Sequence, residues 1–345
     1  MLYGLGTPAT TANGAPMTKP ELRLKSDEAS KEPDLLPLSA FKEAPRIIVI
    51  DVTNSCNLRC PVCPVTIAMT RRRGMMTMET FERIIGDFEG ETEKPEIFFN
   101  FSGEPTLNPI LPRLVARASG AGHKTFLSTN CTKLSERLAE ELIGAGLSRV
   151  YLCMDGFDKE AQEAYRVRSN FDQVKRNIEM FMRTRAHLGA DNPLCILQTL
   201  LTAYSEHQVD DITAWAKEIG IDRIRFKTFS SGTYTSEEEK RTAEQFIPKS
   251  PELRRNVANT VSPLCDEPVA ATLVFWDGSL GLCCIDYDQK VAMPNIKDGG
   301  FLAAYRSDEA AKARRDGYLK KHEICANCSY SNAENMGYKV DLRKG

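Results

Sequence analysis

Three cysteines in one short loop constrain this chain more than any other feature. Cys56, Cys60 and Cys63 are spaced C-x₃-C-x₂-C in the segment CNLRCPVC. Four cysteine thiolates normally hold a cubane iron–sulfur cluster, so three in one loop would leave one iron open to a small molecule. A zinc site would need a fourth ligand, or an open position beside a histidine or carboxylate, and this loop has no histidine. The loop therefore predicts a three-cysteine [4Fe–4S] site.

The same spacing resembles the signature of the radical S-adenosylmethionine (SAM) superfamily. The resemblance implies that SAM binds at the open iron and is cleaved reductively to a 5′-deoxyadenosyl radical, which abstracts hydrogen from an unactivated carbon. It also implies a one-electron donor such as a flavodoxin or ferredoxin.

Composition excludes several classes of protein. The net charge of −2 over 345 residues gives no basic field for nucleic acid. No run of apolar residues approaches the ~18 of a membrane span, and the first residues do not have the pattern of a signal peptide. Eleven cysteines favour metal binding over disulfides. Because such a cluster needs a reducing compartment, we expect a cytoplasmic protein.

Strands and helices alternate along the middle of the chain. Strands are predicted at 46–52, 96–101, 123–128, 149–155, 194–201 and 223–229, and helices at 77–88, 110–120, 135–145, 171–186 and 205–219. Six such repeats predict an α/β fold, a partial (β/α)₆ barrel with its site at the carboxyl ends of the strands. We expect an irregular arm over 1–44, the barrel over 45–230 and a further domain over 231–345.

A second set of cysteines lies in that last region: Cys265, Cys283, Cys325 and Cys328. Asp277-Gly278 between apolar runs predicts a hairpin that returns Cys283 towards Cys265, and a helix is expected at about 301–315. Four thiolates suit a closed iron–sulfur cluster and a structural zinc about equally well.

Residues 46–345 resemble radical SAM enzymes that carry the shortened auxiliary-cluster domain called twitch, a truncated relative of the SPASM domain. The cysteine spacing is similar to that of the aminocyclitol dehydrogenases of antibiotic biosynthesis and also fits sugar epimerases. This resemblance favours an auxiliary [4Fe–4S] cluster at the second set, and so two [4Fe–4S] clusters in all.

The resemblance also indicates where SAM would bind. The segment SGEP after the second strand is similar to the family's GGEP motif, with serine in place of the first glycine. It would place a carboxylate and backbone carbonyls around the methionine ammonium. Val62 could pack on the adenine. The implied contacts are Ser102, Gly103, Glu104, Ser128, Asn130, Arg168 and Gln198.

Two fates of the substrate radical fit an auxiliary cluster. In the first, the radical loses an electron to that cluster and a proton to a base, so that an alcohol carbon becomes a ketone. Lys227 is the preferred base, since it lies nearest the mouth on the strand face that also carries Arg223 and Arg225. In the second, a thiol returns a hydrogen atom and inverts the stereocentre. Cys153 and Cys284 are the candidate thiols.

A third possibility is modification of a ribosomal peptide by thioether formation, cross-linking or epimerisation. Relatives of that kind often carry an N-terminal leader-binding domain, and the arm over 1–44 is too short for one. The preferred substrate is therefore a small molecule, a sugar or aminocyclitol. Arg71, Arg72 and Arg73 follow the cysteine loop and are expected to form a solvated segment or to face an acidic partner.

Overall fold

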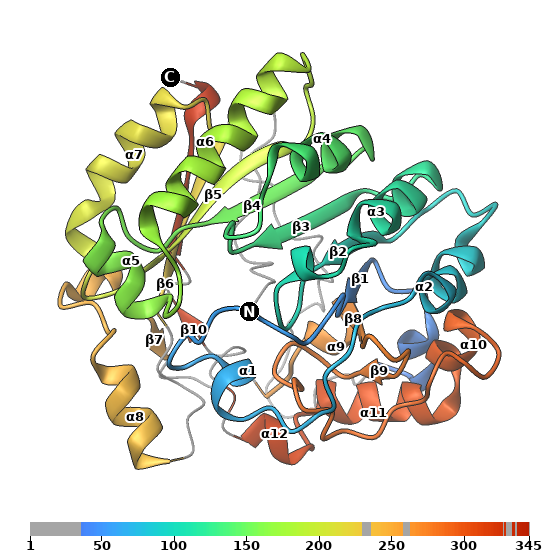
Figure 1. The fold of residues 1–345 in the computed structure, drawn as a ribbon. Helices are drawn as coiled ribbons and strands as arrows, with labels where there is room; N and C mark the ends of the chain where they lie inside the picture. The colour runs from blue at the N-terminus through green and yellow to red at the C-terminus, as the bar shows by residue number, and fades with distance from the viewer. Residues whose placement is uncertain are drawn as a thin grey trace.

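One twisted sheet organises the molecule (Figure 1). The computed structural model describes residues 36–229, 236–257, 263–326, 328, 333–334 and 337–344. Nine strands form the sheet in the order β11-β6-β5-β4-β3-β2-β1-β8-β9, and β7 pairs with β10 in a separate ribbon. The strands are β1 (Ile47–Ile50), β2 (Glu96–Phe99), β3 (Thr125–Thr129), β4 (Arg149–Cys153), β5 (Leu194–Leu201), β6 (Arg223–Thr228), β7 (Asn256–Val257), β8 (Ala271–Val274), β9 (Leu280–Gly281), β10 (Ala333–Glu334) and β11 (Gly337–Asp341).

Helices follow most of the strands and cover the outer face of the sheet (Figure 1). They are α1 (Pro64–Ile67), α2 (Met78–Ile85), α3 (Leu111–Gly120), α4 (Glu136–Gly144), α5 (Lys159–Tyr165), α6 (Phe171–His187), α7 (Val209–Glu218), α8 (Glu237–Glu244), α9 (Glu267–Ala270), α10 (Phe301–Arg306), α11 (Asp308–Tyr318) and α12 (Glu323–Ala326). Within the described part of the chain, no helix has the length and apolar character that crossing a membrane requires.

Alternation along each strand separates two packed faces. In β1, Ile48 and Ile50 belong to the large core against the helices, whereas Ile47 and Val49 belong to a smaller cluster on the inner face with Phe98. Both faces of β1 are buried, which explains why its sequence, IIVI, is apolar throughout rather than alternating. The helices thus cover one face of the sheet, and the opposite face, called the inner face below, carries the smaller cluster.

The predicted partial barrel is confirmed. β1 to β6 are parallel neighbours in sequence order, as the six-repeat pattern predicts, and the sheet does not close on itself. The helix expected at 301–315 is two helices, because Ser307 ends α10 and caps α11 through its side chain. The short helix α5 was not expected. Most of the arm predicted over 1–44 lies outside the described residues.

The C-terminal region extends both edges of the barrel sheet. β8 pairs in parallel with β1, and the predicted hairpin joins it to β9 through Gly278, whose φ of +86° suits glycine. At the opposite edge, β11 pairs antiparallel with β6. Sequence reasoning found the hairpin but not these edge pairings, because pairing partners distant in sequence leave no local pattern.

A buried ion pair joins the cysteine loop to the C-terminal region. The guanidinium of Arg71 donates to Asp51 Oδ2 at 2.7 Å, where the Asp51 side chain is fully buried and that of Arg71 is 9% exposed. Arg71 also lies over the Phe275 ring, 3.8 Å from its centroid, and donates to the Tyr287 carbonyl. Ser102 completes the group by donating to Asp51 Oδ1.

Of the three arginines after the cysteine loop, Arg71 departs from the expectation of a solvated or partner-facing segment, whereas Arg72 and Arg73 are exposed. Arg71 is buried in the ion pair with Asp51. Arg72 lies over the Trp276 ring, and Arg73 donates to the carbonyls of Asn54 and Val65. These contacts hold the segment against the body of the protein.

We expect Arg71→Met to destabilise the protein by about 3–5 kcal/mol, since it leaves the Asp51 carboxylate buried without its cation. Thermal and urea unfolding would measure the change. Asp51→Asn combined with Arg71→Met should recover part of the loss, whereas Arg137→Met, at an exposed helical pair, should change stability by less than ~1 kcal/mol. Equal effects of the Arg71 and Arg137 variants would contradict this role.

Candidate active site

The cysteine loop begins where β1 ends. Thr53 and Asn54 are buried there, and the Asn54 side chain holds the returning segment by donating to the Arg72 carbonyl and accepting from Gly74 N–H. Gly103, with φ of +72°, approaches the same backbone so closely that a Cβ would lie 2.2 Å from the Thr53 carbonyl oxygen. The loop entering Cys56 is thus fixed by its neighbours on both sides.

The three loop thiols are free and lie near one another. Cys60 is buried, and Cys56 and Cys63 are half-buried. Burial raises the pKa of Cys60 to about 12, with added contributions from the charges of Cys63 and Cys56. Leu58 N–H donates to Cys56 Sγ at 3.4 Å, an interaction that favours a thiolate. The donor set of three uncommitted thiols at one strand end fits a cluster with one open iron.

Glu104 is a buried anchor between β2 and β3 rather than a solvated turn residue. Its Oε1 accepts from the hydroxyls of Thr129 and Thr106, each at 2.7 Å, and its Oε2 accepts from Asn130 N–H at 2.7 Å. Burial raises the pKa of Glu104, and these hydrogen bonds oppose the rise. Oε2 has a single hydrogen bond among the described residues, so one lone pair remains for a ligand ammonium.

Several of the predicted SAM contacts gather beside the cysteine loop. Asn130 Nδ2 donates to Asn57 Oδ1 at 3.1 Å and lies 4.0 Å from Cys56 Sγ. Ser128 and Gln198 both contact Cys153 on the inner face, at 3.3 Å and 3.4 Å from its sulfur. Ser102 is committed to Asp51 through its hydroxyl, so only its backbone could serve a ligand. Val62 is buried in a cluster with Phe229 and Phe246.

Arg168 does not join this group. It is exposed, with a φ of +72°, and no described contact directs it to the loop. Arg166, two residues earlier, is the arginine that reaches the site, where it donates to the buried Asp155. Burial disfavours its charge, but Asp155, Cys60 and Cys153 outweigh that effect and raise the pKa of Arg166 well above its usual value. The role of Arg168 stays a prediction, and the place of Arg166 beside Asp155 was not foreseen because α5 was not expected.

Lys227 lies at the mouth end of β6 on the inner face, as predicted. Ile224 and Phe226 pack in the core against the helices. Because successive side chains of a strand point to opposite faces, Lys227 points to the inner face. Burial, reinforced by the charges of Arg225 and Arg255, lowers the pKa of Lys227 to about 7. The negative charges of Cys153 and Asp155 raise the pKa of Lys227, so both groups lie close enough to it to interact electrostatically.

The cysteines of the second set lie within electrostatic reach of one another. Beyond the effect of burial, the negative charge of a Cys328 thiolate raises the pKa of Cys265, Cys284 and Cys325. The charge of Cys265 does the same to the pKa of Cys283. Burial raises the pKa of Cys265 to about 11. Among the described residues no three histidine, cysteine or acidic side chains form a group that could hold a metal ion, so the individual ligand assignments at both sets stay predictions.

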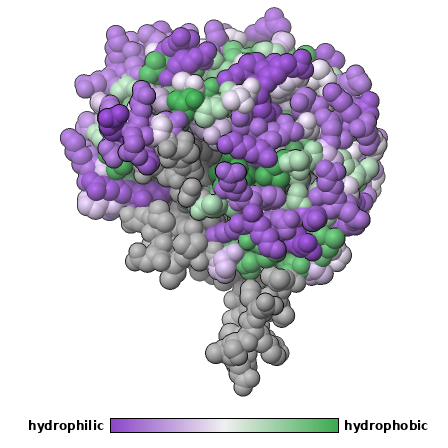
Figure 2. Space-filling view, turned by 90° about the horizontal axis from the view of Figure 1, so that it is seen from below, coloured by the Kyte–Doolittle hydropathy of each residue, from purple (hydrophilic) through white to green (hydrophobic). Residues whose placement is uncertain are grey.

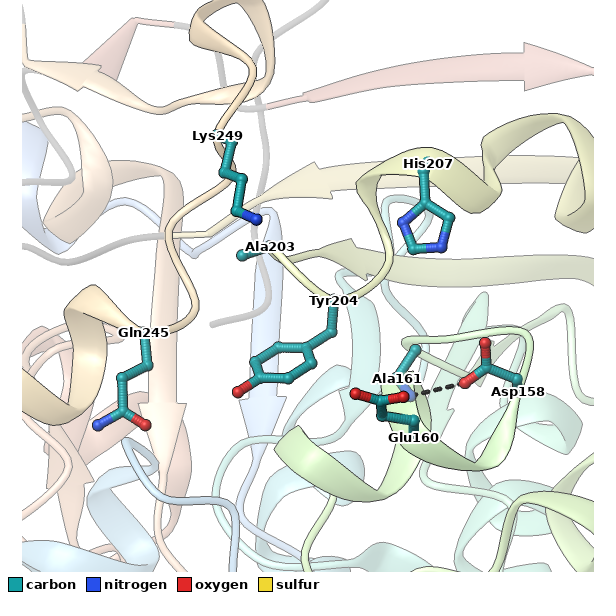
Figure 3. A pocket seen from close by; sticks show the side chains of 8 residues that line it. All are labelled: Asp158, Glu160, Ala161, Ala203, Tyr204, His207, Gln245 and Lys249. Atoms are coloured by element: carbon teal, nitrogen blue, oxygen red, sulfur yellow. Dashed lines mark hydrogen bonds between the residues drawn. The ribbon is translucent and has the colours of Figure 1, made fainter.

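Two cavities border the site. A small one lies between the inner face of β1 and β8 and the second cysteine set; its lining is Val49, Phe101, Glu267, Ala271, Thr272, Leu273, Cys283 and Cys284. A larger one of about 410 Å³ opens beside the carboxyl ends of β4 and β5 (Figure 3), and no predicted site residue lines it. Its lining is Asp158, Glu160, Ala161, Ala203, Tyr204, His207, Gln245 and Lys249. Seen from below, hydrophobic residues gather in the middle of the face with hydrophilic ones around them (Figure 2).

Comparison with protein families assigns the two regions that contain the cysteine sets to known domains. Residues 50–187 match the radical SAM superfamily, and residues 265–329 match SPASM, an iron–sulfur cluster-binding domain. The chain therefore carries a radical SAM domain followed by a SPASM domain. The matches confirm the predicted cofactors, since the first domain implies SAM and a [4Fe–4S] cluster and the second an auxiliary cluster. Each match contains one of the two cysteine sets.

Curated relatives share the radical SAM region and differ in their reactions. The tungsten-containing aldehyde ferredoxin oxidoreductase cofactor-modifying protein of Pyrococcus furiosus is 24% identical over 52% of this chain and 50% of its own length. The PqqA peptide cyclase of Bradyrhizobium diazoefficiens is 26% identical over 52% of this chain and 45% of its own. The chain thus matches about half or less of the length of these relatives.

Solved structures with the same fold extend the likeness beyond that region. BtrN in complex with AdoMet and 2-DOIA aligns with a TM-score of 0.51 and 15% identity over 83% of this chain and 93% of its own. SuiB of Streptococcus suis, bound to its precursor peptide SuiA, aligns with a TM-score of 0.59 and 18% identity over 83% of this chain and 70% of its own. At these identities the likeness establishes the fold alone.

We expect the two cysteine sets to hold separate clusters. Cys283→Ala should lose roughly half of the iron, since two clusters of equal size share it, and should retain SAM cleavage. Cys60→Ala should lose SAM cleavage. Iron analysis and 5′-deoxyadenosine assays of anaerobically reconstituted protein would measure both, with Cys195→Ala, in the core against the helices, as the matched control. Unchanged iron in the Cys283 variant would refute the second cluster.

Proposed function

We propose that this protein oxidises a carbinol carbon of a sugar or aminocyclitol to a ketone. When bound, SAM and the first cluster would supply the hydrogen-abstracting 5′-deoxyadenosyl radical, and the auxiliary cluster would supply a one-electron acceptor. The residues of the chain then have two tasks, which are to orient the carbinol and to take its proton.

The position of the second cysteine set carries this proposal. Cys283 and Cys284 line a cavity together with Val49 and Leu273, which belong to the inner face of the sheet, and with Phe101 at the end of β2. The inner face is the surface on which a substrate would lie. An acceptor at these cysteines would therefore stand beside the substrate, as an oxidation requires and a purely structural metal would not.

Lys227 is the base in this proposal. It lies on the inner face at the mouth end of β6, and its pKa of about 7 leaves a large fraction of it neutral near neutral pH. A neutral amine can accept the hydroxyl proton as the carbon is oxidised. The hydroxyl of a carbon-centred radical is more acidic than that of the alcohol, so an amine of this basicity suffices.

We expect the rate of oxidation to rise as pH increases through about 7 and then to level off, because Lys227 must be neutral to take a proton. Lys227→Met should remove this pH dependence and lower the rate by about 10²-fold or more, with SAM cleavage retained. Anaerobic rate–pH profiles would test it, with the exposed Lys124→Met as control. An unaltered profile in the Lys227 variant would exclude this lysine as the base.

Epimerisation is the second candidate, and the placement of Cys153 favours it. Its thiol is buried on the inner face between Ser128 of β3 and Gln198 of β5, and it is 5% exposed. Burial raises the pKa of Cys153, which keeps it a neutral S–H able to give up a hydrogen atom. Cys284 is the other candidate thiol and lies beside the auxiliary cysteines.

We expect Cys153→Ser to leave oxidation within a few-fold of the wild-type rate if oxidation is the reaction, since the serine hydroxyl preserves the contacts to Ser128 and Gln198. If the protein is an epimerase, the same variant should lose product while still forming 5′-deoxyadenosine. Product analysis by chromatography and mass spectrometry distinguishes the two, with Cys195→Ser, in the core against the helices, as the matched control.

A peptide substrate is the remaining alternative. It is supported by the likeness to PqqA peptide cyclase and by the shared fold with SuiB bound to SuiA. A maturase would form 5′-deoxyadenosine only when a peptide is present. A small-molecule enzyme would respond to sugars or aminocyclitols instead.

A further inference from the structure

The inner face of the sheet carries one row of side chains that crosses four strands. Register pairs Cys153 with Gln198, Gln198 with Arg225, and Arg225 with Lys339 of β11. Gln198 Nε2 lies 3.4 Å from Cys153 Sγ, so the two are in contact. Arg225 therefore stands two strands away from the thiol at the centre of the proposed site.

Arg225 is a buried cation without an acidic partner. It is 9% exposed, and within the described residues its side chain makes no hydrogen bond or ion pair. Burying an unpaired charge is costly, so proteins pair such groups or use them to bind ligands. A guanidinium held ready in this way matches the planar, two-oxygen geometry of a carboxylate or phosphate.

The basic character extends around Arg225. Arg149, on the same inner face, stacks over Phe126 and has a buried Nε without a partner. Among the described residues its one hydrogen bond is donated to the Tyr151 hydroxyl. Lys227 and Lys339 flank Arg225 along and across the sheet. The charges of Arg225, Arg149 and Arg223 all act on Lys339, which shows that these cations share one region.

The acids of this region are already committed. Asp341 accepts from Arg223 at 3.1 Å and from Arg343 at 3.1 Å. Asp155 pairs with Arg166 and accepts from Leu200 N–H at 2.8 Å. Neither carboxylate pairs with Arg225, and among the described residues Arg225 takes part in no ion pair.

We infer that the inner face binds a substrate that carries a phosphate or carboxylate group, with Arg225 as its principal contact. This inference rests on the proposed function, because it concerns the substrate of the same site. It narrows the substrate class to an anionic one, such as a sugar phosphate or sugar acid. An aminocyclitol bearing an ammonium would meet like charges on Arg225 and Lys339, which disfavours it.

Calorimetry on the reconstituted holoenzyme, saturated with SAM and without reductant, tests the inference. The probes are inorganic phosphate, malonate and glucosamine, each at low ionic strength. We expect phosphate or malonate to bind, and we expect the dissociation constant of glucosamine to be at least tenfold larger than that of the anion. Arg225→Gln should weaken anion binding by at least ~10-fold, and Arg137→Gln, an exposed arginine, should leave it unchanged. Tighter binding of phosphate than of malonate identifies a phosphate as the group, and the reverse order a carboxylate.

Three results would overturn the inference: equal anion affinity in the wild type and the Arg225 variant, preferential binding of glucosamine, or anion binding only when SAM is absent. The last would assign Arg225 to SAM instead. Because no radical forms without reductant, these outcomes are independent of whether the oxidation proposal holds. The melting temperature gives a second readout: it should not fall in Arg225→Gln, since the charge has no structural partner, and a marked fall would indicate a structural role.

Discussion

The ion pair between Asp51 and Arg71 joins three parts of the molecule that the site depends on. Asp51 directly follows β1, the strand that leads into the cysteine loop. Ser102 donates to it from the segment after β2, and Arg71 lies over the Phe275 ring beyond β8. Burying two charges carries a desolvation penalty, and their mutual attraction offsets it only while both partners are present. The pair therefore fixes the radical SAM region against the C-terminal region, and with it the two cysteine sets relative to the inner face.

Glu104 also fixes the position of the cysteine loop, from its other side, through hydrogen bonds. Its carboxylate holds Thr129 and Asn130, and Asn130 in turn lies beside Cys56. The motif residue thus connects β2 to β3 and to the loop at once, and one oxygen of the same carboxylate still has room for a ligand. Stability and binding are served by the same side chain, so loss of Glu104 would affect both.

Local patterns in the sequence predicted much of this structure. Strand boundaries in β1 to β6 followed from apolar runs, and the hairpin at Gly278 from its turn residues. The spacing of the first cysteine set predicted its cluster, and the family resemblance predicted SAM and the auxiliary cluster. Long-range facts could not be predicted in this way: the pairing of β8 with β1 and the ion pair between Arg71 and Asp51 both depend on partners distant along the chain. The unpaired state of Arg225 is of the same kind, because it depends on which acids other arginines have already taken.

The central claim is that the auxiliary cysteine set serves as an electron acceptor beside the substrate. Its most direct test is an anaerobic assay of reconstituted enzyme in deuterium oxide, in which 5′-deoxyadenosine and product mass are followed together over a panel of sugar phosphates, sugar acids and aminocyclitols. The account predicts a product lighter by two hydrogen atoms, formed in step with 5′-deoxyadenosine. A product of unchanged oxidation state that has gained one deuterium would contradict it and would assign the final step to a thiol.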